Sequence, residues 1–396
     1  MRTFPRSFRR ALLWGLALLS SACTDSYLPD VIKTPPNYLV VDGFINTQGV
    51  TTVKLSRTAA IGSAAAVPPE TRAGVYIEEE GGPRYLLTEG VKGTYTSAAL
   101  TLNPTRNYRL HLNTLAGKDY ASDFVPAKTT PPIDEVRWQL ENTGLNVYVS
   151  AHDAANATRY YRWEYIETWE IFPPYQPTIE YVNKILRTIV VPFPRLCWGN
   201  APSAGVQIDK TTTLSQDVVA DYRLRVLSPT SERLYTRYSI LVRQHALTKD
   251  EYAYWELLRK NTESIGTLFD PQPAQLTGNV HCLSTANELV LGYVGAHSTT
   301  EKRLFIGRTE LPRSLNVRSG YEACLPPDTV LLFPRGVVPP PKPADIIDAA
   351  FSDPKRLLPI EYVRDGNGNG VGVTGKSPDC VDCRLRGTSV KPSFWP

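Results

Sequence analysis

Residues 38–56 read YLVVDGFINTQGVTTVKLS, and this stretch indicates the β-strand structure of the folded region. Its first half is an apolar run interrupted by a glycine kink at Gly43, and its second half, from Thr51 to Ser56, alternates polar and apolar side chains. Alternation with a period of two is typical of a β-strand that buries one face. The sequence therefore predicts two consecutive strands at the start of the folded region.

Further short runs of the same kind continue to residue 125. They lie at residues 75–80, 85–87, 93–96, 108–112 and 121–125, with glycines and other turn residues between them. About seven strands in roughly ninety residues is the pattern of a small β-sandwich. We therefore assign residues 37–130 to an Ig-like β-sandwich domain.

A Thr-Thr-Pro-Pro linker at residues 129–132 precedes a second series of strand-like runs, which includes residues 145–149, 160–165, 222–227, 235–242 and 302–306. Residues 172–202 are interrupted by prolines and predict an extended loop or a peripheral hairpin. Thr248 and Glu251 form a capping box, which predicts one amphipathic helix over residues 249–262. We assign residues 131–312 to a second β-rich domain, and residues 313–396 to a Pro/Gly/Cys-rich tail packed on the body.

Cys23 follows a short apolar segment that begins after four arginines. This segment is too short to cross a bilayer, which takes roughly 20 residues. Small residues at positions 21 and 22 suit cleavage by a signal peptidase. We expect residues 1–22 to be a lipoprotein signal peptide, Cys23 to carry lipid that anchors the protein to a membrane, and residues 23–36 to form a tether. The alternative is an ordinary secretory signal that is cut nearby.

Composition agrees with a β-rich exported protein. The chain has 33 Pro and 21 Tyr but a single Met. Proline is found mainly in loops and edge strands, and tyrosine favours strands and partly solvent-exposed surfaces. The net charge of +4 includes the arginines of the signal segment, so the mature chain is nearly neutral and offers no electrostatic case for nucleic acid.

Five further cysteines, Cys197, Cys282, Cys324, Cys380 and Cys383, are candidates for disulfides. Thiols pair in oxidising compartments outside the cytoplasm, although sequence does not give the connectivity. Five is an odd number, so at least one thiol stays free or pairs with a partner. The Cys380-x-x-Cys383 spacing also fits a redox pair or half a zinc site, but no second such pair exists to complete a zinc site. We therefore favour structural disulfides.

Other motifs are incomplete. Residues 365–370 match the first half of a calcium loop, yet Lys376 stands where a glutamate ligand is needed, so a flexible turn is the better interpretation. The five histidines show no metal-binding spacing, and no catalytic fingerprint appears. Glu164 and Glu170 each follow a tryptophan, as acids in sugar sites often do, although such neighbours also arise by chance in aromatic-rich strands. We assign no catalytic residue, no metal and no cofactor.

The order of several segments resembles one family of exported bacterial lipoproteins, domain of unknown function 4249, which is typical of Bacteroidota. The resemblance rests on residues 38–45, 53–58, 252–258, 268–273, 278–280 and 292–293, and on the terminal pattern from Cys380 to Trp395. It implies an outer-membrane-associated lipoprotein, a first domain similar to the regulatory domains of carboxypeptidases, and genetic association with TonB-dependent transporters. It implies no established activity and no catalytic residues.

These observations together predict a lipid-anchored, mostly β protein of the outer membrane, on the cell surface or on the periplasmic face. We expect an accessory or binding protein, associated with a TonB-dependent transporter. The alternatives are a surface enzyme that acts on glycans, which needs two carboxylates about 5 to 10 Å apart in a cleft, and a structural component of the envelope.

Overall fold

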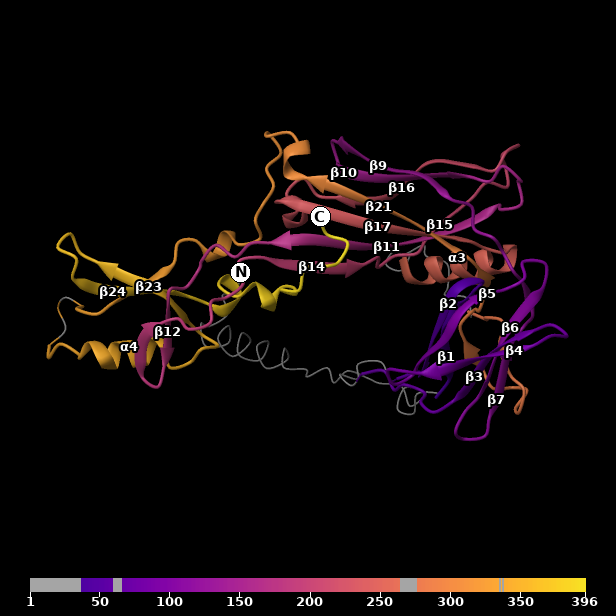
Figure 1. Cartoon of the computed structure of the whole chain (residues 1–396), viewed down its shortest axis with the longest axis horizontal. Helices are drawn as coiled ribbons and strands as arrows, with labels where there is room; N and C mark the ends of the chain where they lie inside the picture. The colour runs from indigo at the N-terminus through magenta and orange to yellow at the C-terminus, as the bar shows by residue number, and fades with distance from the viewer. Residues whose placement is uncertain (1–36, 60–65, 264–275, 335, 337) are drawn as a thin grey trace, which may run out of the picture.

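A computed structural model of the chain describes residues 37–59, 66–263, 276–334, 336 and 338–396. Strands dominate this part of the chain, which confirms the prediction of a mostly β fold (Figure 1). The α-helices within the described ranges are α3 (Lys249–Glu263) and α4 (Pro343–Phe351), and short 3₁₀ turns lie at Glu232–Leu234, Arg308–Glu310, Glu322–Cys324, Pro378–Cys380 and Cys383–Leu385. None of the described helices is long and apolar enough to cross a membrane.

An 11-stranded sheet makes up the N-terminal part of the molecule, in the order β18-β7-β6-β3-β4-β5-β2-β1-β19, with β8 paired to β6 and β20 paired to β1. The strands from the first part of the chain are β1 (Leu39–Asn46), β2 (Gln48–Arg57), β3 (Gly74–Glu79), β4 (Arg84–Glu89), β5 (Thr94–Thr101), β6 (Asn107–Asn113), β7 (Asp119–Ser122) and β8 (Val125–Pro126). Strands β1 and β6 are not neighbours in this order, yet they contact each other. The sheet therefore folds over one shared core, as a sandwich does, but remains continuously hydrogen-bonded.

Alternation in β2 explains how this sheet presents one polar face. Thr51, Val53 and Leu55 are buried in the core, whereas Thr52 and Lys54 point outward. The period-two pattern seen in the sequence therefore reports a strand that is half buried. Lys54 reaches the outer side of the sheet for this reason.

Three short strands from later in the chain complete the N-terminal sheet: β18 (Val280–Cys282), β19 (Val290–Leu291) and β20 (Ala296–His297). β18 pairs with β7, and both β19 and β20 run parallel to β1. The sequence analysis assigns residues 131–312 to the second domain. The structure differs from this assignment, because β18, β19 and β20 pair with strands of the first sheet. Pairings of two or three residues leave too little periodic pattern to be recognised in a sequence.

Two sheets packed face to face form the second region (Figure 1). One consists of β9 (Ile133–Glu141), β10 (Gly144–His152) and β16 (Val218–Leu227), and the other of β11 (Tyr160–Ile171), β14 (Cys197–Pro202), β15 (Gln207–Lys210), β17 (Arg237–Ala246) and β21 (Thr299–Gly307). Their shared core draws side chains from both sheets, such as Val147 of β10 and Trp163 of β11. Helix α3 matches the predicted helix within one residue at its end and contacts β11 and β15.

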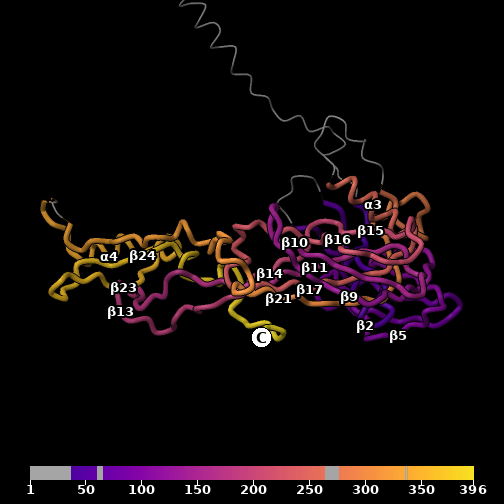
Figure 2. Tube along the Cα trace, turned by 90° about the horizontal axis from the view of Figure 1, so that it is seen from above, coloured from indigo at the N-terminus to yellow at the C-terminus, as the bar shows by residue number. Residues whose placement is uncertain are grey.

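A third part, which we call the arm, projects from the far end of these sheets (Figures 1 and 2). It contains a hairpin of β12 (Ile179–Val182) and β13 (Ile185–Thr188), a sheet of β22 (Asp328–Leu331), β24 (Gly370–Lys376) and β23 (Leu358–Arg364), and helix α4. The sequence predicts a tail packed on the body from residue 313 onward, but much of that segment builds the arm. Its two ends pack on the second region: Leu315, Val317 and Tyr321 contact the core of that region, and near the C-terminus Thr388 pairs with Trp198 and Trp395 is buried.

Candidate functional site

A cavity of about 780 Å³ lies between the N-terminal sheet and the second region. Strands β1 and β2 form one wall, and β11, β17 and α3 form the other. A second cavity of about 440 Å³ adjoins it. We call the two together the interdomain cleft, and the residues that line both are Asp42, Lys54, Arg162, Glu164, Arg243 and Trp255.

Three aromatic side chains gather on one side of the interdomain cleft. The ring of Tyr254 lies 5.6 Å from that of Trp255 and 5.5 Å from that of Tyr293, measured between centroids. Burial raises the pKa of Tyr293 to about 12, so this phenol stays protonated. The guanidinium of Arg162 sits 4.2 Å from the centre of the Trp255 ring. The cleft therefore offers apolar ring surface directly beside charge.

Charges in the interdomain cleft are of both signs. Arg162 pairs with Glu164, and Arg243 pairs with Glu301 at 2.6 Å. Asp42 and Lys54 occupy matched positions on β1 and β2 but make no ion pair with any described residue. Some side chains in the cleft are therefore already neutralised, whereas others are exposed and available to a ligand.

A buried polar cluster lies behind the interdomain cleft. Glu251 Oε1 of α3 is 3.5 Å from His297 Nε2, and His245 Nε2 of β17 is 3.9 Å from Glu164 Oε2. Phe44 of β1 stacks on His297 at 4.2 Å and meets His245 edge-on at 5.0 Å. Burial holds the pKa of His245 well below its ordinary value, so its imidazole is neutral at pH 7.

The chain passes directly from the N-terminal sheet to the second region beside this cluster. Only Ser298 separates β20 from β21, and its hydroxyl accepts a hydrogen bond from the Thr130 amide at 2.9 Å. The Thr130 hydroxyl in turn accepts from the Ala246 amide at 3.0 Å. The two walls of the cleft are therefore joined by short, buried hydrogen bonds, which favours a cleft of fixed shape.

Four of the five candidate cysteines other than Cys23 fall at the other end of the molecule. The structure joins Cys197 to Cys383, with Cα atoms 5.7 Å apart, and Cys324 to Cys380, also at 5.7 Å. Cys282 is buried in β18 without a disulfide partner. Cys23 lies outside the described residues, as does the segment 268–273 of the family resemblance.

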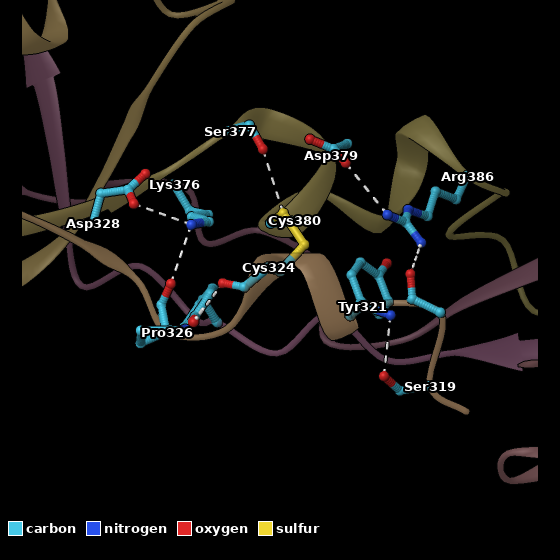
Figure 3. The surroundings of a disulfide bond; sticks show 12 residues. Ser319, Tyr321, Cys324, Pro326, Asp328, Lys376, Ser377, Asp379, Cys380 and Arg386 are labelled. Carbon is cyan, nitrogen blue, oxygen red and sulfur yellow. Dashed lines mark hydrogen bonds and ion pairs between the residues drawn. A yellow bond between two sulfur atoms is a disulfide. The ribbon is translucent and has the colours of Figure 1, made fainter. Parts of the chain in front are cut away.

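Both disulfides lie at the base of the arm, which we call the neck, and Figure 3 shows the surroundings of Cys324–Cys380. Ser377 Oγ lies 3.3 Å from Cys380 Sγ, and Arg386 donates to the Gly320 carbonyl at 2.6 Å while its guanidinium lies 4.0 Å from the centre of the Tyr321 ring. Among the described residues, the one group spaced closely enough to ligate a metal is Cys324, Asp379 and Cys380. The sulfurs of Cys324 and Cys380 are bonded to each other, so this group does not act as a metal site in this structure. The CxxC motif, Cys380-x-x-Cys383, contributes one cysteine to each of the two neck disulfides.

The two acids that follow tryptophans have separate surroundings. Glu164 lines the interdomain cleft, whereas Glu170 accepts a hydrogen bond from Trp395 Nε1 at 2.9 Å near the C-terminus. Trp163 is buried, and its indole donates to Gln244 at 2.8 Å. The pair Trp163–Glu164 therefore does not act as a joint aromatic–carboxylate site.

Sequence reasoning missed most of the interdomain cleft. Of the aromatic residues of α3, Tyr252 anchors the helix on the sheet, against Ile208 and Leu247. Trp255 instead lies partly in the cleft. The available signal was the outward face of the alternating strands, where Lys54, Arg162 and Arg243 recur, but alternation does not tell what faces that side.

Comparisons with solved structures give only distant similarity. A protein described as a "putative carbohydrate binding protein" from Bacteroides uniformis ATCC 8492 is 9% identical over 54% of this chain and 92% of its own, with a TM-score of 0.15. Chitinase ChiA74 from Bacillus thuringiensis is 13% identical over 47% of this chain and 29% of its own, with a TM-score of 0.14. No curated protein matches. TM-scores this low support no argument about fold or function.

The sequence itself identifies the family. The family described as Domain of unknown function (DUF4249) matches residues 24–303, which is well over half of the chain. The match includes the strands of the N-terminal sheet, both walls of the interdomain cleft and helix α3. This protein belongs to the DUF4249 family.

Proposed function

We propose that this protein is a lipid-anchored binding protein of the bacterial outer membrane and that the interdomain cleft is its ligand site. The observation that carries the proposal is the cleft itself. It is concave, it is bordered by elements of both regions, and it combines aromatic rings with a few polar groups. Ligand sites of proteins have this composition, and they commonly lie between domains with volumes of roughly 300 to 1,000 Å³.

A binding role without catalysis agrees with the contacts that two acids of the cleft already make within the protein. Glu164 is paired with Arg162, and Glu251 is buried beside His297. Among the described cysteines, four form disulfides and Cys282 is buried away from the cleft, so none supplies a nucleophile there. The cleft lining therefore suits the capture of a ligand better than its cleavage.

A glycan-active enzyme is the second candidate, because Glu164 and Glu251 both line the interdomain cleft. The purified protein is incubated with neutral oligosaccharides, and the products are separated by chromatography. We expect no shortening of any substrate. Shortening that is lost in both Glu164→Gln and Glu251→Gln would replace the binding proposal with an enzymatic one.

The membrane location rests on Cys23, and the proposed partner, a TonB-dependent transporter, rests on the family resemblance. The full-length chain and its Cys23→Ser variant are expressed in a bacterium of the Bacteroidota with radiolabelled palmitate. We expect only the wild type to incorporate the radiolabelled palmitate and to appear in the outer-membrane fraction. We also expect a transporter to co-purify with it from gently solubilised membranes. An unlabelled wild type in the soluble fraction would contradict the anchor, and a protein that purifies alone would contradict the partner.

A further inference from the structure

The charges that line the interdomain cleft balance. Lys54, Arg162 and Arg243 supply three cations to its larger cavity, and Asp42, Glu164 and Glu251 supply three acids. A strongly anionic ligand would meet the carboxylates, and a strongly cationic one would meet the lysine and the arginines. A wholly apolar ligand would remove these groups from water without giving them partners, which is costly. The lining therefore favours a ligand that is polar but carries no net charge.

Two hydrogen-bond donors at the cleft lack a partner among the described residues. They are Arg162 Nε and the indole nitrogen of Trp255, and both atoms are shielded from solvent. Arg162 as a whole is only 8% exposed and lines both cavities. Buried donors are nearly always satisfied in folded proteins. Because neighbouring protein atoms cover both donors, a ligand oxygen reaches them only if Arg162 or Trp255 changes its side-chain conformation.

The unpaired side chains of the cleft complement those donors. Lys54 can donate and Asp42 can accept, and the two lie side by side on adjacent strands. A hydroxyl group donates and accepts at once, so it can bridge such a pair, which a carboxylate or an ammonium group cannot do. The rings of Tyr254 and Tyr293 stand nearby and present apolar surface. Alternating hydroxyls and apolar C–H faces are the chemistry of a sugar ring.

We propose that the interdomain cleft binds a neutral carbohydrate chain, an inference that rests on the proposed binding function. Asp42 and Lys54 hold ring hydroxyls from the side of the N-terminal sheet. Arg162 and Trp255 line the opposite side. The aromatic rings of α3 and Tyr293 pack against the C–H face of the sugar. The ligand is either a free oligosaccharide or a glycan of the cell envelope, since both present the same groups.

Isothermal titration calorimetry tests this proposal on the mature full chain with Cys23→Ser, which removes the lipid. The probes are cellohexaose, maltohexaose, mannohexaose, delipidated envelope polysaccharide, hexagalacturonate and hexaalanine. We expect at least one neutral glycan to bind, and hexagalacturonate and hexaalanine to bind at least tenfold more weakly. Binding of a hexaose indicates a nutrient, and binding of the envelope polysaccharide alone indicates the cell's own glycan.

Variants connect the binding to the cleft. Lys54→Met and Asp42→Asn alter exposed side chains with little change of volume, so both should fold and raise Kd about tenfold or more, since hydrogen bonds to charged groups contribute on that scale. Trp255→Ala should also weaken binding. The matched control is Lys92→Met, which changes an exposed lysine in the turn between β4 and β5, outside the cleft, and should leave Kd unchanged.

The outcomes separate the two proposals. Tight binding of hexagalacturonate or hexaalanine, weakened by Lys54→Met, would overturn the neutral-carbohydrate inference and leave the proposed binding function standing. Binding of a neutral glycan that is unaffected by all three cleft variants would overturn the placement in the cleft. No binding by any probe, in a chain that melts cooperatively, would overturn the carbohydrate inference and count against the proposed function as well.

Discussion

The N-terminal sheet joins the second region through non-covalent contacts, whereas the arm joins the same region through two disulfides. Around the interdomain cleft, Phe44 of β1 meets His245 of β17 edge-on, and Thr130 bonds to both Ser298 and Ala246. At the neck, Cys197–Cys383 and Cys324–Cys380 tie the ends of the two chain segments that build the arm.

The size of the cores explains this difference. The N-terminal sheet and the second region each enclose a large cluster of buried apolar side chains. In the arm, the cluster of fully buried residues consists of Ile179, Phe351 and Val373. Small cores rarely offset the conformational entropy of the chain, and cross-links compensate by restricting the unfolded state. Covalent bonds are thus placed where burial is weakest, and the cleft relies on packing and hydrogen bonds.

The largest expected effect follows from opening the neck. Replacing Cys324 and Cys380 by serine removes a cross-link that closes a loop with a sequence separation of 56. The loop entropy of such a closure corresponds to about 4 kcal/mol. We expect hydrogen exchange in residues 325–379 to accelerate to near the unfolded rate, while the N-terminal sheet keeps its protection.

Cys282→Ser is the control for this change, because Cys282 is buried but forms no disulfide. Its exchange pattern in the arm should equal that of the wild type. Full protection of the arm in the double serine variant would show that its own core suffices, and the contrast between the two junctions would then be wrong.

The next largest effect comes from the non-covalent packing of the returning strands on β1, within the N-terminal sheet. Gly292 has φ +125, and a Cβ there would lie 2.0 Å from the Val41 carbonyl oxygen of β1. Strain and overpacking together predict that Gly292→Ala destabilises the protein by about 3 kcal/mol. The control is Gly90→Ala, since a Cβ at Gly90 would meet nothing within 4 Å. Thermal unfolding measures both, and equal Tm values for the two variants would contradict the close approach.

Gly292 also shows where sequence reasoning succeeds. Gly278, Asn279 and Gly292 belong to the short pieces that suggested the family, and the structure supplies their physical reason. A Cβ at Gly278 would lie 1.6 Å from the Gly292 carbonyl oxygen, and the Asn279 side chain bonds to both the amide and the carbonyl of Val294. These residues let the short strands β18 to β20 pack closely on the first sheet.

Periodic elements were predictable because their signal is local. Strand β2 alternates over residues 51–56, and α3 begins after the Thr248 cap, whose hydroxyl accepts from the Glu251 amide at 3.2 Å. The interdomain cleft was not predictable, because Lys54, Arg162 and Arg243 come from strands far apart in the chain. Only the folded arrangement shows that their side chains line the same cavities.

Acid should weaken the junction at the interdomain cleft. His245 is buried beside His297 and Glu164, with Arg162 and Arg243 nearby, and its pKa lies well below the ordinary 6.5. The unfolded chain therefore binds a proton below pH 6.5 that the folded chain does not bind. Stability falls as pH falls through this window, by about 1.4 kcal/mol per pH unit for this group.

Denaturant unfolding at pH 7, 6 and 5 measures this slope. His245→Gln should reduce it by that amount. The arm offers a second contrast, because its disulfides are insensitive to acid in this range, so its hydrogen-exchange protection should persist. A slope that is the same in the wild type and in His245→Gln would exclude the buried imidazole as its source.

The smallest expected effect concerns calcium at the far end of the arm. Asp365 begins the turn between β23 and β24, and its carboxylate accepts from the amides of Asn367 and Asn369, at 2.9 and 2.8 Å, and from the Asn369 side chain. These bonds lower the pKa of Asp365 and stabilise the turn without an ion. A lone carboxylate supplies too little charge for a tight calcium site. Millimolar CaCl₂ should therefore leave Tm unchanged, as should EGTA. A rise in Tm with CaCl₂ that disappears in Asp365→Asn would instead establish a calcium loop, and the arm would then be stabilised by a metal as well as by its disulfides.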